Sequence, residues 1–147
     1  MIQYVFLNES HVAPIAELEK LCFSDPWSEN SIRYELTNPL SLWLVVLEDD
    51  RVAGYVGSQT VLDEADMMNI AVHPDFRRRG LAEALVTRLV TELRQKQVRC
   101  LTLEVRASND PAIALYQKLG FAQVGRRPNY YRNPKEDALI LRKEWSL

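Results

Sequence analysis

The segment from Arg77 to Ala82 has the residue types and spacing of an anion-binding turn. It places Gly80 between three arginines and the start of an amphipathic helix, in the pattern Arg-x-x-Gly-x-Ala. Glycine lets the backbone turn tightly and lets an anion approach it closely. The first N–H groups of a helix have no partner within the helix, and the helix dipole adds partial positive charge there. The segment is therefore predicted to bind a phosphate group.

Other phosphate-binding motifs do not fit this loop. No Gly-Lys-Ser/Thr follows it, as in the P-loop nucleotide hydrolases, and no Gly-x-Gly-x-x-Gly of a dinucleotide-binding fold is present. Three adjacent arginines can also form an ordinary solvated patch. The flanks of the loop, a strand-like run at 67–72 and a long helix, favour phosphate binding over that alternative.

Two side chains elsewhere could move protons. Glu104 interrupts an apolar strand, in which alternation places Leu103 and Val105 on one face and Glu104 on the other. The residues alone leave open whether Glu104 is a general base or an exposed carboxylate, paired for example with Arg106. Tyr116, with an ordinary phenol pKa near 10, lies beside the core face of a short helix. It is either a general acid or a tyrosine at the edge of the core.

The predicted elements alternate between strands and helices. Strands are predicted at 2–7, 42–47, 52–62, 67–72, 98–105, 121–125 and 138–141, and helices at 8–22, 28–38, from 81 onward and at 112–119. A long polar loop is expected at 126–137, and Asp110 is expected to cap the last helix, with Pro111 at its first position. This order predicts one α/β domain over 1–147, a mixed sheet with helices on both faces. The strand–helix–strand unit around Gly80 is expected to be parallel.

Composition argues against several classes of protein. The formal net charge is -2, so no overall electrostatic drive toward nucleic acid or an anionic membrane is expected. No apolar run approaches the roughly 20 residues that a membrane helix needs, and Met1–Tyr4 lacks the features of a signal peptide. Two cysteines and two histidines are too few and too scattered for a disulfide framework or a metal centre. A cytoplasmic protein without metal is expected.

Three motifs, in order, resemble those of the GNAT acetyltransferases. They are the strand end Asn69–Pro74, the Arg77–Ala82 loop, and Ala112–Phe121, which has the pattern Ala-x-x-Leu-Tyr-x-x-x-Gly-Phe. The resemblance covers essentially the whole chain. It implies the GNAT fold, a mixed and mostly antiparallel sheet whose central parallel strand pair is splayed to admit CoA. It also implies acetyl-CoA as co-substrate and no metal.

The resemblance also assigns roles to individual residues. The glycine loop would hold the pyrophosphate of CoA, mainly through its backbone, and backbone N–H groups at 70–72 would stabilise the thioester carbonyl. Glu104 would be the general base toward the amine, and Tyr116 the acid that protonates the departing thiolate. The implied cofactor-binding residues are Ile70, Ala71, Val72, Arg77, Arg78, Arg79, Gly80, Leu81, Ala82 and Asn109.

Within the family, four segments resemble the bacterial RimI-type enzymes, which acetylate the N-terminal alanine of a small-subunit ribosomal protein. The segments are Asp25–Ser28, Val61–Ala65, Leu103–Asn109 and Asn129–Tyr131. They imply direct acetyl transfer, in a ternary complex, to the α-amine of a ribosomal protein. Alternatives are transfer to a small-molecule amine or a lysine side chain, and a non-catalytic CoA-binding module. The sequence does not indicate an oligomeric state.

The resemblance also places aromatic residues along the acceptor groove. Trp27, Tyr130 and Tyr131 are the implied substrate contacts, with Tyr34 nearby on the second helix. Their alternative role is ordinary packing. A basic cluster, consisting of Arg126, Arg127 and Arg132, would meet either an acidic stretch of substrate or only solvent.

Overall fold

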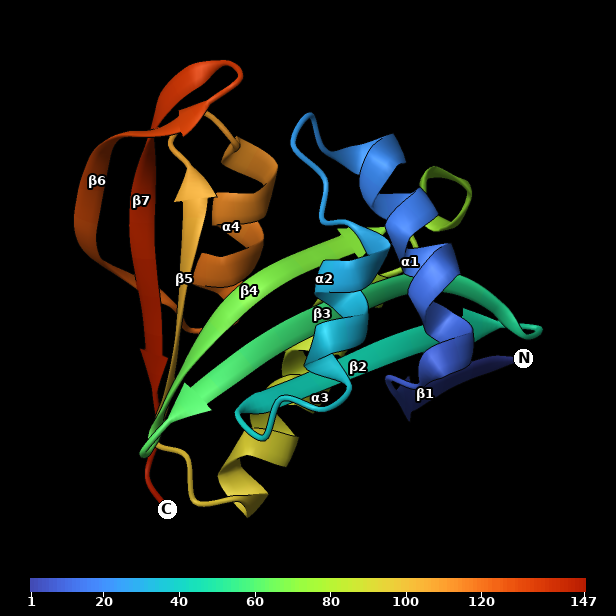
Figure 1. Cartoon of the computed structure of the whole chain (residues 1–147). Helices are drawn as coiled ribbons and strands as arrows, with labels where there is room; N and C mark the ends of the chain where they lie inside the picture. Colours follow the sequence, from blue (N-terminus) through green and yellow to red (C-terminus); the bar gives the residue numbers. More distant parts are fainter.

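The seven strands form one sheet in the order β1-β2-β3-β4-β5-β7-β6 (Figure 1). The computed structural model describes residues 1–147. Its elements are β1 (Ile2–Phe6), α1 (Glu9–Cys22), α2 (Glu29–Glu35), β2 (Ser41–Glu48), β3 (Arg51–Val61), β4 (Glu64–Val72), the short 3₁₀ turn η1 (Pro74–Phe76), α3 (Leu81–Gln95), β5 (Cys100–Arg106), α4 (Asp110–Lys118), β6 (Ala122–Arg132) and β7 (Lys135–Glu144). The predicted element order is confirmed.

Two hydrophobic clusters lie on opposite faces of the sheet. The larger contains 21 buried residues and joins the sheet to α3 and α4, with Leu85 and Leu89 fully buried. The smaller contains nine buried residues and packs α1 and α2 against β2, β3 and β4, with Ile15 and Ile32 at its centre. Each helix buries one apolar stripe in this way. The prediction of helices on both faces is confirmed.

The strands β4 and β5 are the only parallel neighbours in the sheet, and they separate along their length. Their pairing covers only Glu64–Asp66 against Cys100–Thr102. Both strands then continue, to Val72 and Arg106, without pairing to each other. Figure 1 shows them close at one end and far apart at the other, with α4 beside the gap. The predicted splayed parallel pair is therefore confirmed.

A β-bulge in β4 decides which side chains face which helices. Against β3, Asn69 pairs with Gly57 but Met67 pairs with Ser58, so Met68 is an extra residue in the strand. Met67 accordingly packs in the cluster beneath α3, whereas Ala71 packs in the cluster beneath α1 and α2. Side chains of a regular strand alternate with a period of two, so without the bulge both would share one face.

The C-terminal part of the chain differs from the prediction. The segment 126–137 is not a polar loop, because β6 continues to Arg132 and β7 starts at Lys135, which makes a hairpin with a two-residue turn. β6 is an edge strand whose side chains are mostly exposed. An edge strand needs no apolar alternation and tolerates a proline, here Pro128. Polar composition alone therefore misled the prediction.

Two helix ends also differ from the prediction. Asn109, not Asp110, caps α4, because the Asn109 side-chain oxygen accepts a hydrogen bond from the Ala112 N–H at 3.3 Å. Pro111 consequently occupies the second helical position. Both side chains are good caps by type, so composition could not separate them. The helix α2 ends at Glu35, earlier than predicted.

Candidate active site

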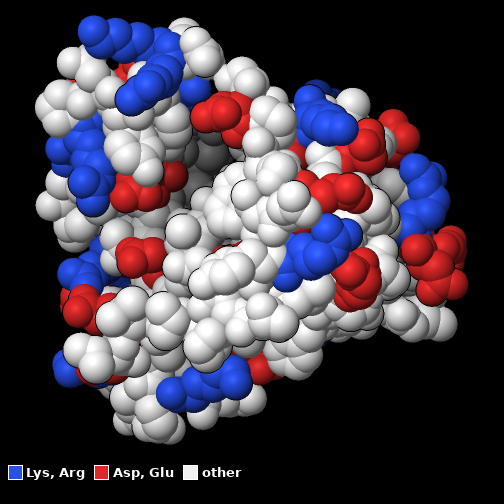
Figure 2. Space-filling view, viewed as in Figure 1, with Lys and Arg blue, Asp and Glu red and all other residues white.

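A cleft of about 1040 Å³ lies in the gap between β4 and β5. Figure 2 shows a hollow on this face, between the part of the molecule formed by β5, β6 and β7 and the part covered by α1 and α2. The cleft is lined by the loop that follows α1, by β4, by the glycine loop, by β5 and α4, and by the end of the β6–β7 hairpin. Every predicted site residue except Arg79 lines it.

The glycine loop has the geometry of an anion cradle. Gly80 has φ of +72° and is the N-cap of α3, without any side-chain cap, and Arg78 has φ of +65°. The N–H groups of Leu81, Ala82 and Glu83 make no hydrogen bond within the protein. A Cβ on Gly80 would meet no atom within 4 Å. The left-handed backbone, and not crowding, therefore favours glycine at this position.

The arginines of this loop are mostly engaged elsewhere. The Arg77 Nε donates to the carbonyl oxygen of Val72 at 3.1 Å. The Arg79 guanidinium lies 3.6 Å from a carboxylate oxygen of Glu48. Only Arg78 has no hydrogen-bond or ion-pair partner. The free N–H groups at the start of α3 are thus the main donors that the loop offers to an anion.

At every second residue, β4 turns its backbone N–H and C=O groups toward the cleft. His73 N–H donates to the Ala53 carbonyl oxygen at 2.7 Å, across the β3–β4 pair. Because an antiparallel strand presents its polar groups to one partner at every second residue, Ala71 also faces β3. Ile70 and Val72 direct theirs toward the gap. Val72 can therefore offer its N–H group to a substrate, whereas the Ile70 N–H, which also faces the gap, already donates to the Asn69 side chain at 3.1 Å. Ala71 contributes only its side chain.

Glu104 lies on the face of β5 that is turned toward α1 and α2. Its side chain is 27% exposed, and its carboxylate lies 3.3 Å from the Nε of Arg127. The suggested ion pair with Arg106 is wrong, because Arg106 pairs with Glu136 at 3.3 Å instead. Long-range pairing of β5 with β7, and of β7 with β6, brings Arg127 across. Sequence proximity could not show this.

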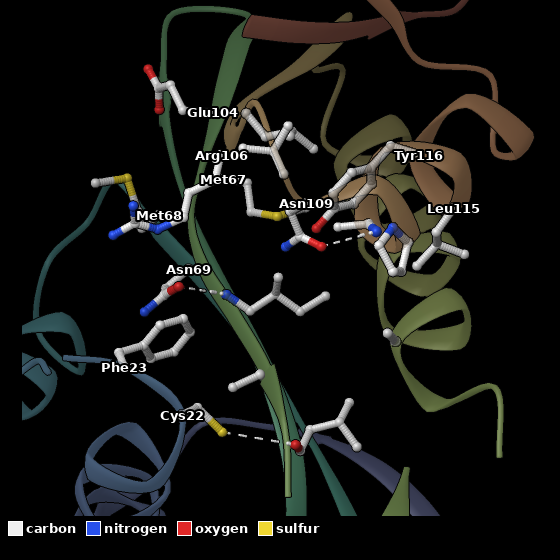
Figure 3. A pocket seen from close by; sticks show the side chains of 18 of the residues that line it. Cys22, Phe23, Met67, Met68, Asn69, Glu104, Arg106, Asn109, Leu115 and Tyr116 are labelled. Carbon is white, nitrogen blue, oxygen red and sulfur yellow. Dashed lines mark hydrogen bonds between the residues drawn. The ribbon is translucent and has the colours of Figure 1, made fainter. Parts of the chain in front are cut away.

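Tyr116 approaches the gap from the opposite side. It is only 5% exposed, packs edge-on against Phe121 with ring centroids 5.6 Å apart, and makes no hydrogen bond through its hydroxyl. Burial, and secondarily the neighbouring Tyr131, raises the pKa of Tyr116 to about 12. In Figure 3 its hydroxyl end points toward β4, and Glu104 lies on the other side of that strand. A proton donor and a carboxylate thus flank one gap.

The comparison with family models decides what this arrangement is. Residues 12–121 match the model described as the acetyltransferase (GNAT) family. The chain belongs to the GNAT acetyltransferase family. GNAT enzymes use acetyl-CoA as co-substrate, and the gap between β4 and β5, with free N–H groups at the start of α3, suits that molecule.

Individual GNAT proteins are similar to this chain over most of their length. The [ribosomal protein bS18]-alanine N-acetyltransferase of Salmonella typhimurium is 45% identical over 127 residues, or 85% of each chain. The protein of that name from Escherichia coli K12 is 41% identical over 126 residues, or 84% of each chain. The crystal structure of the ribosomal-protein-S18-alanine N-acetyltransferase from Escherichia coli has a TM-score of 0.93 and 37% identity, and covers 100% of this chain and 96% of that chain. The GNAT fold is confirmed.

A Gly80→Val substitution tests whether the glycine loop binds the pyrophosphate of CoA. A β-branched residue in the left-handed region costs roughly 1–2 kcal/mol, and it would displace the N–H groups that open α3. We expect the dissociation constant for acetyl-CoA to rise at least about tenfold, measured by calorimetry on the folded variant. Gly80→Asn is the control, because asparagine tolerates this backbone. A folded Gly80→Val protein with unchanged affinity would remove the loop from this role.

A buried carboxylate behind the cleft was missed by the sequence analysis. Glu19, on α1, is 1% exposed and accepts hydrogen bonds from the Trp27 N–H at 2.8 Å, from the Asn69 side-chain amide at 2.7 Å, and from the Tyr55 hydroxyl. It therefore ties the loop after α1 to β3 and β4. The available signal was a charged residue on the apolar stripe of α1, between Ile15 and Cys22.

Asn69 extends this network to the β4 backbone. Its side-chain oxygen accepts a hydrogen bond from the N–H of Ile70 at 3.1 Å, while its amide donates to Glu19. Figure 3 shows Asn69 beside the cleft, with Phe23 and Cys22 on the same side. The position of one cleft-facing N–H group is therefore linked, through Asn69, to a carboxylate in the core.

Burial raises the pKa of Glu19 to about 7, although hydrogen bonds from Trp27 and Asn69 oppose the shift. The folded state thus holds this proton more tightly than the unfolded chain does, so the free energy of unfolding should fall as pH rises from about 4.5 to 7. Between pH 5 and 8, the wild type should lose about 2 kcal/mol more stability than Glu19→Gln. Urea unfolding measures this difference.

Glu17→Gln is the matched control for Glu19. Glu17 lies on the same helix, but its side chain is 72% exposed and pairs only with Lys20. Its replacement should leave the pH dependence of stability as in the wild type. If the free energy of unfolding changed with pH in the same way in the wild type and in Glu19→Gln, folding would not raise the pKa of Glu19.

The aromatic residues predicted at the acceptor groove do line the cleft. Trp27 packs edge-on against Trp43, with centroids 5.4 Å apart, and Tyr130 packs edge-on against Tyr131 at 5.0 Å. The Ser24 hydroxyl donates to the Asn133 carbonyl oxygen at 2.9 Å. That bond joins the loop after α1 to the β6–β7 turn. The cleft therefore has aromatic walls carried by two segments that touch each other.

The predicted basic cluster is largely neutralised within the protein. Arg126 pairs with Asp137 at 2.8 Å, and Arg127 pairs with Glu104.

No group of three or more His, Cys, Asp or Glu side chains is placed to hold a metal ion. None of the helices combines the length and the apolar character that a membrane crossing requires.

Proposed function

We propose that this GNAT enzyme transfers the acetyl group of acetyl-CoA to the N-terminal α-amine of a ribosomal protein, with alanine as the preferred first residue. The observation that carries the proposal is the pair of proton-transfer groups, Glu104 and Tyr116, on either side of one gap in the sheet. Relatives at 41% and 45% identity carry the name of a ribosomal protein alanine N-acetyltransferase, which supports this acceptor.

The cofactor end of the cleft would hold acetyl-CoA in an extended form. The free N–H groups of Leu81, Ala82 and Glu83 suit the pyrophosphate, because they are donors at the positive end of a helix dipole. The unpaired edges of β4 and β5 leave backbone donors for the amide groups of pantetheine. Asn109 caps α4 and lines the same gap.

The chemistry needs one proton removed and one proton supplied. The substrate ammonium, with a pKa near 8, would lose a proton to Glu104, directly or through water. The neutral amine would then attack the thioester carbonyl carbon, and a β4 backbone N–H would stabilise the developing oxyanion. As the carbon–sulfur bond breaks, Tyr116 would donate its proton to the thiolate. Transfer in this ternary complex requires no cysteine nucleophile. Cys22 is the last residue of α1, and Cys100 is buried at the start of β5.

The walls of the acceptor side favour a small first residue. Trp27, Tyr130 and Tyr131 are large and line the cleft, and both Trp27 and Tyr131 are at least partly buried. Rings held in this way leave little room for a large side chain but present flat surfaces to a peptide backbone. Because ribosomal proteins are made in the cytoplasm, we place the enzyme there.

A competition assay tests the acceptor. Peptides that begin with alanine, serine or leucine are mixed with spermidine and with a peptide whose only amine is an internal lysine, and products are located by mass spectrometry. The proposal expects acetylation at the α-amine of the alanine peptide first. Preference for spermidine would indicate a small-molecule enzyme, and preference for lysine a side-chain acetyltransferase. Absence of turnover with bound acetyl-CoA would favour a non-catalytic module.

A further inference from the structure

A second, smaller hollow lies beside the acceptor cleft, between α2 and β3, with a volume of about 420 Å³. Its lining residues are Trp27, Asn30, Ser31, Tyr34, Glu35 and Gln59. Trp27 also lines the main cleft, so the two hollows share a wall. A peptide whose first residue enters the main cleft has this hollow within reach of its next side chains.

The hollow is built by one face of α2. Asn30, Ser31 and Tyr34 follow one another at the helical spacing that places side chains on a common face. Ile32 points away from that face and is fully buried in the cluster with α1. The polar face of α2 is therefore not needed for packing, and it stands over β3 next to the open acceptor side.

Glu35 gives the hollow its chemistry. Glu35 is only 5% exposed. The two oxygens of its carboxylate accept hydrogen bonds, one from the Gln59 side-chain amide at 2.7 Å and one from the Asn38 side-chain amide at 3.0 Å. No lysine, arginine or histidine lies within 4 Å of it, in contrast to most other carboxylates that this protein buries in part. A buried carboxylate held only by neutral amides lacks a countercharge.

The carboxylate can still bind a cation. Each carboxylate oxygen has two acceptor positions, and the two amides occupy one on each. The ring of Tyr34, which is 65% exposed at the rim, offers a surface for the aliphatic stem of a long side chain. The lining thus combines an apolar rim with a negative floor, as a lysine or arginine side chain requires.

We infer that this hollow is a subsite for a basic side chain of the acceptor peptide. That side chain belongs to the second or third residue of the peptide, where the residue with the acetylated amine is the first. The inference rests on the proposed function, because it takes a peptide as the acceptor. An extended peptide chain advances about 3.3 Å per residue. One or two residues beyond the cleft therefore suffice to bring a side chain past Trp27.

The test is a set of alanine-initiated peptides that differ only at positions two to four, each carrying lysine, glutamine or glutamate. The wild type should show a KM for the lysine peptide at least about tenfold below that for the glutamate peptide, at position two or three and not at position four. The KM for acetyl-CoA should be the same for all peptides. The preference should weaken at high salt, because it is electrostatic.

Variants assign the preference to Glu35. Glu35→Gln keeps the shape and removes the charge, so lysine and glutamine peptides should become equivalent. Gln59→Lys places an ammonium group next to Glu35 and should abolish the preference without removing the carboxylate. Glu29→Gln is the matched control, because Glu29 is an exposed carboxylate on the same helix that does not line the hollow, and it should retain the preference.

The outcomes separate this inference from the proposed function. Equal KM values for lysine, glutamine and glutamate peptides, all acetylated at the α-amine, would overturn the subsite and leave the function standing. An unchanged lysine preference in both Glu35→Gln and Gln59→Lys would also overturn it. Failure to acetylate any of the alanine-initiated peptides would overturn the proposed function itself.

Discussion

Turnover should fall about 10²–10⁴-fold in a Glu104→Gln variant, which is the usual contribution of general-base catalysis. Glutamine keeps the size of the side chain and the position on β5 but cannot accept the proton of the substrate ammonium. The loss should appear in kcat at neutral pH, with the affinity for acetyl-CoA unchanged. It should shrink as pH rises above the pKa of the peptide amine, near 8, because neutral amine is then present without a base.

The control for this prediction is Asp66→Asn. Asp66 lies on β4 in register with Thr102, and so near Glu104, but it does not line the cleft. Its replacement removes a nearby negative charge and should change kcat little. Steady-state rates between pH 6 and 10 compare the three proteins. Wild-type turnover in Glu104→Gln at neutral pH would show that another group, or water, takes the proton.

The second large effect is expected for Tyr116→Phe. The hydroxyl makes no hydrogen bond within the protein, so its removal should leave the free energy of unfolding nearly unchanged. The rate of acetyl transfer should fall about 10²-fold, because the departing thiolate loses its proton donor. With a pKa of about 12, Tyr116 holds its proton throughout the neutral range. The wild-type rate should therefore show no loss from Tyr116 ionisation below about pH 11.

Single-turnover measurements at saturating acetyl-CoA isolate the transfer step. The control is Tyr4→Phe, because Tyr4 is a partly buried tyrosine whose pKa is also raised by burial, but it lies on β1 and outside the cleft. Tyr4→Phe should transfer acetyl at the wild-type rate. An unchanged transfer rate in Tyr116→Phe would reduce Tyr116 to a packing residue.

The fold was predictable from local patterns wherever one face of an element is buried. The stripe of α3 and the alternation of Leu103, Glu104 and Val105 are such patterns, and both agree with the structure. The β6–β7 hairpin was missed, because an edge strand with exposed side chains carries no apolar period. Its existence depends on backbone pairing with β7, which no local pattern records.

The candidate site was predictable in part for a related reason. The glycine loop, Glu104 and Tyr116 lie in short motifs, so the sequence alone could mark them. Glu19 and Arg127 do not, because their roles come from contacts between residues far apart in the chain. Glu35 is similar, since its isolation from cations is a property of the folded protein and not of its sequence neighbours.

The extra residue at Met68 determines which face of the sheet each later side chain of β4 occupies. Everything in β4 after the bulge is turned over relative to everything before it, so Met67 belongs to one layer and Ala71 to the other. A substitution at Met68 changes one side chain, whereas removal of that single residue would exchange the layers for the whole remainder of the strand. Asn69 would then leave Glu19, and Ile70 and Val72 would turn their polar groups away from the gap. In this part of the chain, length is constrained more tightly than residue identity.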